Sequence, residues 1–178
     1  MQGSPPTVET EQPSAQPDRP GIAAPAPLIA GLTLGFGYLL DQIWWIGGIG
    51  SIPRPYRVTI ALLLLALGGW FLWIGIAAFR RLGTDFNPLR PSTVLATSSI
   101  YAKTRNPMYQ GFVLVTLGFG FLLRSDWTIL LLLPAMLLLH YGVVLREERY
   151  LERKFGDDYR AFKRSVPRYG LPFGRSKI

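Results

Sequence analysis

The chain has 178 residues, of which 49% are hydrophobic, and a formal net charge of +8. This length predicts one domain with a short tail. The sequence contains no cysteine and one histidine, His140, which excludes disulfides, thiolate chemistry and a histidine-rich metal cluster, so no metal site is expected. The basic residues adjoin long apolar runs, which favours a membrane bilayer over nucleic acid as their partner.

Residues 1–27 form the first segment of the chain. They are rich in Pro, Gln, Ser and Thr, and no basic stretch precedes an apolar core as it would in a signal peptide. A segment of this composition buries too little apolar surface to fold. We therefore predict a disordered, Pro-rich tail, followed by a membrane domain over residues 28–178.

Four apolar runs follow the tail. Because a helix rises about 1.5 Å per residue, 19 residues reach about 28 Å, close to the hydrocarbon thickness of about 30 Å. The third run is short and is expected to tilt or to begin at Asn106 and Pro107, since a first-turn proline loses no helical hydrogen bond. Pro134 is expected to kink the fourth run. The predicted fold is an all-α integral membrane protein with four transmembrane helices, at 28–46, 58–79, 107–123 and 127–145.

The distribution of Lys and Arg predicts the orientation of these spans. With both termini in the cytoplasm, sixteen of the 19 basic residues lie on the inside and three on the outside. Basic loops stay on the cytoplasmic side of a membrane. We therefore expect cytoplasmic termini, and a cytoplasmic location for the loop before the third span and the segment 146–178.

Polar residues gather at two places on this expected cytoplasmic face. The stretch Arg105–Gly111 enters the third span, and Glu147 and Glu148 follow the fourth. A helix N-terminus beside a cation attracts anions, so this arrangement suits a polar ligand. Two alternatives stay open: the carboxylates are solvated partners of neighbouring arginines, and Arg105 is a membrane-surface anchor. His140 is either a pocket residue or a hydrogen-bonding group within the bundle.

The C-terminal segment is predicted to be helical in two parts. Arg146–Phe155 continues the fourth span, Gly156 breaks the helix, and Asp157 caps a second helix that ends near Arg164. Four apolar side chains recur along one face of these helices. This face either lies on the bilayer surface or covers the mouth of the bundle, and it consists of Leu151, Phe155, Tyr159 and Phe162.

The order of these motifs resembles a known superfamily, that of the integral-membrane isoprenylcysteine carboxyl methyltransferases and phospholipid methyltransferases. The resemblance covers roughly Gly83 to Arg168. It rests on Arg-Asn-Pro-Met-Tyr-x-Gly at 105–111, Glu-Glu-Arg-x-Leu at 147–151, Phe-Gly-x-x-Tyr-x-x-Phe at 155–162 and Val-Pro-Arg at 166–168. It implies S-adenosyl-L-methionine as cofactor, held by membrane helix ends and the C-terminal segment.

The resemblance also implies the site residues. Glu148 and Arg105 are the catalytic candidates among them, and the position of His140 near the mouth of the bundle adds it as a third. Asn106 stands where prenylcysteine enzymes often have histidine, which argues against specific carboxyl methylation. The implied cofactor-binding set is Arg105, Asn106, Pro107, Tyr109, Gly111, Glu147, Glu148, Tyr159 and Arg168. His140 joins this set from its position and not from the resemblance, because it lies about one and a half helical turns before Arg146, near the expected cytoplasmic mouth.

The predicted function is methyl transfer to a lipophilic or membrane-embedded carboxylate, amine or thiol at the cytoplasmic face. One alternative is an NADPH-dependent enzyme like the sterol reductases, with the extra phosphate near Arg153, Lys154, Lys163 and Arg164. Another is a non-enzymatic membrane subunit. Gly31 and Gly35 have the spacing of close helix packing, within the chain or in a homodimer.

Overall fold

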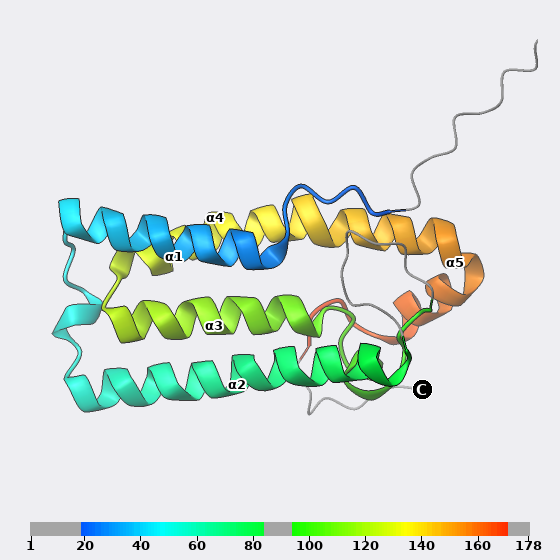
Figure 1. Ribbon diagram of the computed structural model, residues 1–178, viewed down its shortest axis with the longest axis horizontal. Helices are drawn as coiled ribbons and strands as arrows, with labels where there is room; N and C mark the ends of the chain where they lie inside the picture. Colours follow the sequence, from blue (N-terminus) through cyan, green and yellow to red (C-terminus); the bar gives the residue numbers. More distant parts are fainter. Residues whose placement is uncertain (1–18, 84–93, 171–178) are drawn as a thin grey trace, which may run out of the picture.

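The computed structural model describes residues 19–83 and 94–170, and this part of the chain contains helices and no strand. The longer helices run nearly parallel to the long axis of the molecule (Figure 1). The elements in chain order are α1 (Ala26–Ile43), the 3-10 turn η1 (Ile49–Ser51), α2 (Arg54–Arg81), the 3-10 turn η2 (Ser99–Ala102), α3 (Pro107–Leu123), α4 (Asp126–Leu137), the π-helix η3 (Leu138–Val144) and α5 (Leu145–Ser165).

Small residues let the helices approach closely. Within the bundle α2 packs most extensively against α3, and α1 packs against α4. A Cβ atom on Gly111 of α3 would lie 2.9 Å from the carbonyl oxygen of Gly68 on α2, so both helices need glycine at this crossing. A Cβ on Gly31 or Gly35 of α1 would meet nothing within 4 Å. The predicted close packing at these two glycines is therefore not made within the described chain.

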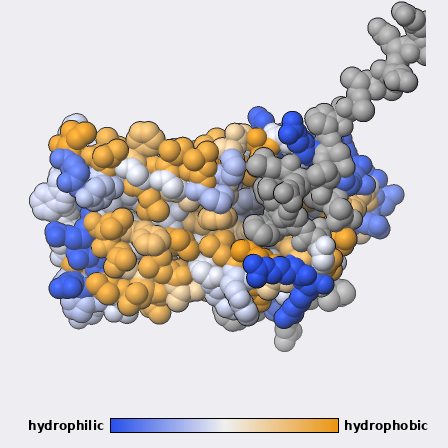
Figure 2. Space-filling model, viewed as in Figure 1, coloured by the Kyte–Doolittle hydropathy of each residue, from blue (hydrophilic) through white to orange (hydrophobic). Residues whose placement is uncertain are grey.

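Within residues 19–83 and 94–170, three helices are long and apolar enough to cross a membrane, namely α1, α2 and the continuous helix Asp126–Ser165. The helix α3 is apolar but shorter, with 17 residues. Apolar side chains cover the middle of the bundle and hydrophilic ones gather at its two ends (Figure 2). Charged α5 extends beyond the apolar part of the helix that begins at Asp126. The predicted all-α class is confirmed, with α3 falling short of the length of its neighbours.

The last helix departs from regular geometry at two places. After Pro134 the helix widens into the π-helix η3, four residues further along. A proline removes one backbone donor from the helix, and a π-turn is one way to accommodate this. The predicted break at Gly156 is confirmed by its φ of 54° and ψ of −122°. The Asp157 carboxylate, expected to cap the second part, accepts hydrogen bonds from Arg160 instead.

The end of the N-terminal tail differs from the prediction. Residues 19–25 are not separate from the domain, because the Ala23 backbone N–H donates to the Gly142 carbonyl at 2.9 Å. The Arg146 side chain also donates to the Gly21 carbonyl at 3.0 Å. The widened turn of η3 thus provides a backbone acceptor that the sequence pattern did not reveal. Residues 1–18 of the predicted tail, and residues 84–93 of the proline-containing loop, lie outside the described residues.

Candidate functional site

A cavity of about 300 Å³ lies at the end of the bundle where α1 and α3 begin, α2 ends and α5 starts. We call this end the α5 end. Charged and aromatic side chains form one part of the wall and apolar ones the rest. The lining residues are Pro25, Ala26, Pro27, Phe79, Val94, Leu95, Ala96, Tyr101, Arg105, Asn106, Pro107, Met108, Tyr109, Phe112, Glu147, Glu148, Leu151, Tyr159 and Phe162.

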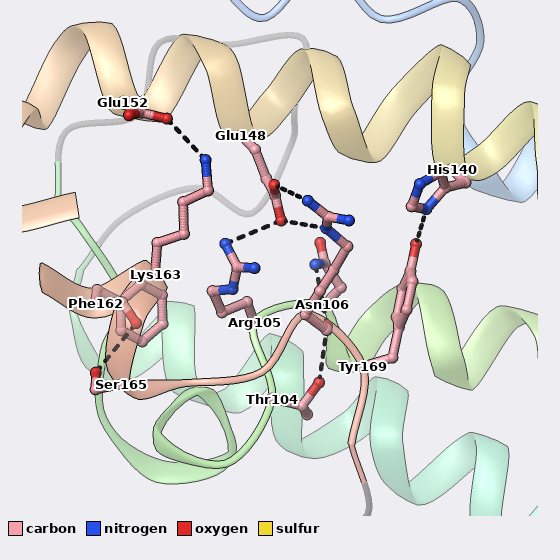
Figure 3. Close-up of polar contacts among 11 residues, drawn as sticks. Thr104, Arg105, Asn106, His140, Glu148, Glu152, Phe162, Lys163, Ser165 and Tyr169 are labelled. Carbon is pink, nitrogen blue, oxygen red and sulfur yellow. Dashed lines mark hydrogen bonds and ion pairs between the residues drawn. The ribbon is translucent and has the colours of Figure 1, made fainter. Parts of the chain in front are cut away.

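Glu148 is the centre of a buried ion network (Figure 3). The residue is only 5% exposed, and its carboxylate accepts two hydrogen bonds from Arg168, each of 2.8 Å, in the bidentate geometry that suits a guanidinium. Arg105 Nη1 lies 3.1 Å from Glu148 Oε1, and the Arg105 side chain is 7% exposed. One carboxylate therefore shares its charge with two guanidinium groups.

Arg105 keeps unused hydrogen-bonding capacity. Its Nε is buried and has no hydrogen-bond partner among the described residues, and its contact to Glu148 is an ion pair without hydrogen-bond geometry. A buried donor without an acceptor costs free energy. Because Arg105 lines the cavity, an oxygen atom of a bound anion would satisfy this donor.

A C-terminal strap, residues 166–170, fastens the network to the start of α3. The Arg105 backbone N–H donates to the Pro167 carbonyl at 3.0 Å, and the side chains of Thr104 and Asn106 each donate to the Arg168 carbonyl at 3.2 Å. Gln110 donates to the Gly170 carbonyl at 3.0 Å. These bonds fix the backbone of Arg168 and so aim its guanidinium at Glu148.

Glu147 has a different environment although it is the neighbour of Glu148. Its Oε2 accepts a hydrogen bond of 2.6 Å from the Tyr109 hydroxyl. Burial raises the pKa of Glu147, the hydrogen bond from Tyr109 partly opposes this, and the charge of Glu148 adds to the rise. The result is a carboxyl group that holds a proton at higher pH than an ordinary glutamate.

The pKa of Glu148 moves the opposite way. Burial alone would raise it, but the hydrogen bonds from Arg168 and the charges of Arg105 and Arg168 together outweigh burial and lower it. Two adjacent carboxyl groups on one cavity wall therefore have pKa values shifted in opposite directions. Such a separation of pKa values is typical of sites where one carboxylate binds and the other transfers a proton.

The four-residue apolar face of α5 covers the end of the bundle and does not lie apart from it. Tyr159 and Phe162 are buried in a cluster with Phe71 of α2 and Tyr101 of η2, and Leu151 and Phe155 pack against this cluster. Of the two positions that the sequence allows, the structure therefore shows the covering one. The cavity is closed on this side by aromatic rings.

Most of the predicted site residues come together. Seven line the cavity: Arg105, Asn106, Pro107, Tyr109, Glu147, Glu148 and Tyr159. Arg168 does not line the cavity, but it donates two hydrogen bonds to Glu148, which does. Gly111 packs against α2, and His140 Nδ1 lies 2.9 Å from the Tyr169 hydroxyl, so neither is part of the lining.

Other lining residues were not found from the sequence. Phe112 lies three positions after Tyr109 and so shares its face of α3, a spacing that could have identified it. Tyr101 precedes the motif in the short turn η2. No spacing or motif in the sequence identifies Pro25, Ala26 and Pro27 as lining residues, because only the packing of α1 brings them to the cavity.

The fold and site define a helical membrane protein with a polar cavity at one end of its bundle. A family model described as phospholipid methyltransferase matches residues 56–158, more than half of the chain. The chain therefore belongs to the phospholipid methyltransferase family, which also confirms the resemblance drawn from the motifs. The match includes both halves of the polar site, at α3 and α5.

Two curated relatives are informative. The chain is 32% identical over 119 residues to the protein-S-isoprenylcysteine O-methyltransferase of Schizosaccharomyces pombe, over 64% of this chain and 49% of that protein. It is 30% identical over 147 residues to the nickel-cobalt-cadmium resistance protein NccN of Alcaligenes xylosoxydans, over 79% of this chain and 68% of that protein. The chain thus spans about half the length of the first relative. No solved structure matches it.

Proposed function

We propose that this protein transfers a methyl group from S-adenosyl-L-methionine to a lipophilic acceptor at the cytoplasmic face of a membrane. The observation that carries the proposal is the cavity at the α5 end, where a buried guanidinium with a free donor faces the same space as two carboxyl groups. Family membership supports the reaction type. The similarity to a protein-S-isoprenylcysteine O-methyltransferase supports a lipophilic acceptor.

The residues of the cavity suit the polar end of the methyl donor, an amino acid with a carboxylate and an ammonium group. Arg105 would hold the carboxylate through its unpartnered Nε. Glu148 would accept from the ammonium group, since a carboxylate offers about four lone-pair positions and arginine nitrogens contact its two oxygens at three of them. The bound cofactor supplies an activated methyl group on sulfur.

The protein's own contribution is binding, orientation and exclusion of water. The covering face of α5, with Tyr159 and Phe162, shields the site from solvent. The strap holds Arg168, and Arg168 holds Glu148 in one orientation. Fixed alignment of two reactants accounts for a large part of the acceleration in displacement reactions. The apolar side of the cavity, with Phe79, Leu95 and Phe112, provides a surface for a lipophilic acceptor.

We place the α5 end in the cytoplasm. Most basic residues of the chain are in segments at this end, including those of α5. The positive-inside rule assigns such an end to the cytoplasm. The cofactor is water-soluble and would enter from this side. An acceptor dissolved in the bilayer would reach the cavity beside the start of α1, where Pro25, Ala26 and Pro27 form part of its wall.

The test is binding of S-adenosylhomocysteine to the full chain in lipid nanodiscs by isothermal titration, with NADPH in parallel. We expect saturable binding of S-adenosylhomocysteine and a loss of at least about tenfold in Arg105→Ala, because a hydrogen bond to a charged group contributes about 1.5–3 kcal/mol. Arg153→Ala is the matched control, since Arg153 is exposed and does not line the cavity. Binding of NADPH alone would instead assign the chain to the reductase-like class.

If a folded sample binds neither ligand, the site has no nucleotide-type cofactor and the non-enzymatic subunit becomes the better explanation.

Homodimer formation is a separate proposal. Gly31 and Gly35 leave an open, closely approachable strip on α1, which suits helix packing between two copies. Crosslinking in nanodiscs, with Gly35→Leu as the variant, tests it.

A further inference from the structure

We propose that Glu147 is the proton acceptor of the site, and that the methyl acceptor is therefore a nucleophile that carries a proton, such as an amine or a thiol, and not a carboxylate. This inference rests on the proposed methyl transfer. It concerns a choice among acceptor classes that neither the family nor the relatives decide. The argument begins with the unequal surroundings of two neighbouring carboxyl groups.

The contacts of Glu148 leave it little freedom. Both of its oxygens contact arginine nitrogens, at 2.8 Å from Arg168 Nε, 2.8 Å from Arg168 Nη2 and 3.1 Å from Arg105 Nη1. Such a group stays ionised, and protonating it would break a buried ion network. Glu148 can therefore hold a cation in place but is a poor acceptor for a proton.

The contacts of Glu147 leave one oxygen available. Its Oε2 accepts from the Tyr109 hydroxyl at 2.6 Å, and within the described part of the chain Oε1 has no hydrogen-bond partner. Glu147 lines the cavity, so Oε1 belongs to a carboxyl group that an incoming ligand can reach. A general base needs this combination of a fixed orientation and one free lone pair.

The groups around Glu147 do not compensate its charge. Tyr109 on α3, Tyr101 on η2, Glu148 on the same helix and Tyr159 beyond the Gly156 break are the titratable groups coupled to it. Arg105 lies on the same cavity wall but pairs with Glu148. Burial, with no cationic partner among the residues that the structure describes, raises the pKa of Glu147, which brings it closer to neutral pH and suits proton transfer.

The proton balance follows from this placement. The bond between hydrogen and the acceptor atom breaks, the proton moves to Glu147 Oε1, and the electron pair stays on the nitrogen or sulfur that is to be methylated. That electron pair then forms the new bond to the methyl carbon. The bond between this carbon and the donor sulfur breaks, and the sulfur keeps its electron pair. A carboxylate acceptor has no proton to give up, and its charge would be repelled by ionised Glu147.

The competing role for Glu147 is to bind the cofactor's ammonium group. The variant Glu147→Gln in nanodiscs separates the two. We expect the variant to bind S-adenosylhomocysteine with unchanged affinity. In the wild type, we expect an infrared carbonyl band from protonated Glu147 that titrates above the ordinary glutamate range, and the variant should lack this band. With a labelled methyl donor, we expect the wild type to methylate dodecylamine or dodecanethiol but not dodecanoic acid. In Glu147→Gln, the rate of this methylation should fall by about 10²-fold or more.

Tyr109→Phe gives a further readout. The Tyr109 hydroxyl stabilises ionised Glu147, so its loss should raise the pKa of Glu147 and move the acid limb of the pH profile, or the infrared titration, upward by about one pH unit.

Four outcomes overturn the inference: methylation of dodecanoic acid, undiminished methylation of the amine or thiol in Glu147→Gln, loss of S-adenosylhomocysteine binding in Glu147→Gln, or a wild-type infrared titration unaffected by Glu147→Gln. If none of the three probes is methylated, the binding and infrared results decide by the same criteria. Failure of the proposed function looks different, because then the wild-type protein itself does not bind S-adenosylhomocysteine.

Discussion

Replacing Glu148 with glutamine should destabilise the fold strongly, because the change removes the charge that two arginines share. Arg168 donates two hydrogen bonds of 2.8 Å to this carboxylate, and the buried Arg105 guanidinium lies 3.1 Å from it. Removing one partner of a buried ion pair costs about 3–5 kcal/mol. Glutamine retains one acceptor oxygen, so we expect the lower end, about 3 kcal/mol.

Thermal unfolding in nanodiscs at neutral pH measures this cost. For a chain of this size, 1 kcal/mol corresponds to about 2–4 °C, so Glu148→Gln should lower Tm by about 6–12 °C. Glu152→Gln is the matched control on the same helix. Its carboxylate pairs with Lys163 at 3.1 Å, but the two side chains are 33% and 39% exposed. An exposed pair contributes about 0–1 kcal/mol, so the control should change Tm little.

The pH dependence gives a second check on the same pair. The pKa of Glu148 is lowered from 4.5 in the folded protein, so its contribution to stability is present above the unfolded value and is lost as pH falls through the folded one. The difference in Tm between wild type and Glu148→Gln should therefore shrink below about pH 4.5. Equal losses of Tm in Glu148→Gln and Glu152→Gln, or a gap that persists in acid, would refute the ion-network account.

Three further predictions concern other parts of the molecule. Because folding raises the pKa of Glu147, its ionisation opposes folding, and Glu147→Gln should keep or increase Tm at pH 8, opposite in sign to Glu148→Gln. Gly37→Ala should lower Tm because the added Cβ would overlap the backbone of Thr128, whereas Gly35→Ala meets nothing within 4 Å and should not. Ser125→Ala should cost about 1 kcal/mol in thermal unfolding, because Ser125 Oγ caps α4 by accepting from the Thr128 N–H at 3.0 Å.

The sequence by itself determined the helices and the polar motifs. Uninterrupted apolar runs bounded by Pro, Gly and charged residues specify where helices start and stop, and α3 begins at Pro107 and ends at Leu123 as predicted. The break at Gly156 followed from one glycine in a charged helix. Arg105 and Glu148 could be placed at the same end of the bundle before the structure, because spans of known length bring their segments together there, but their ion pair could not be predicted.

The tertiary structure alone decided what each polar residue does. Glu147 and Glu148 are adjacent in sequence, but successive helical residues point in different directions, so one meets Tyr109 and the other meets Arg105 and Arg168. Arg168 reaches Glu148 only because distant backbone groups hold the strap. His140 turns to Tyr169 and away from the cavity lining. Packing between segments that are far apart in the sequence fixes these partners, and no local sequence pattern predicts which groups will meet.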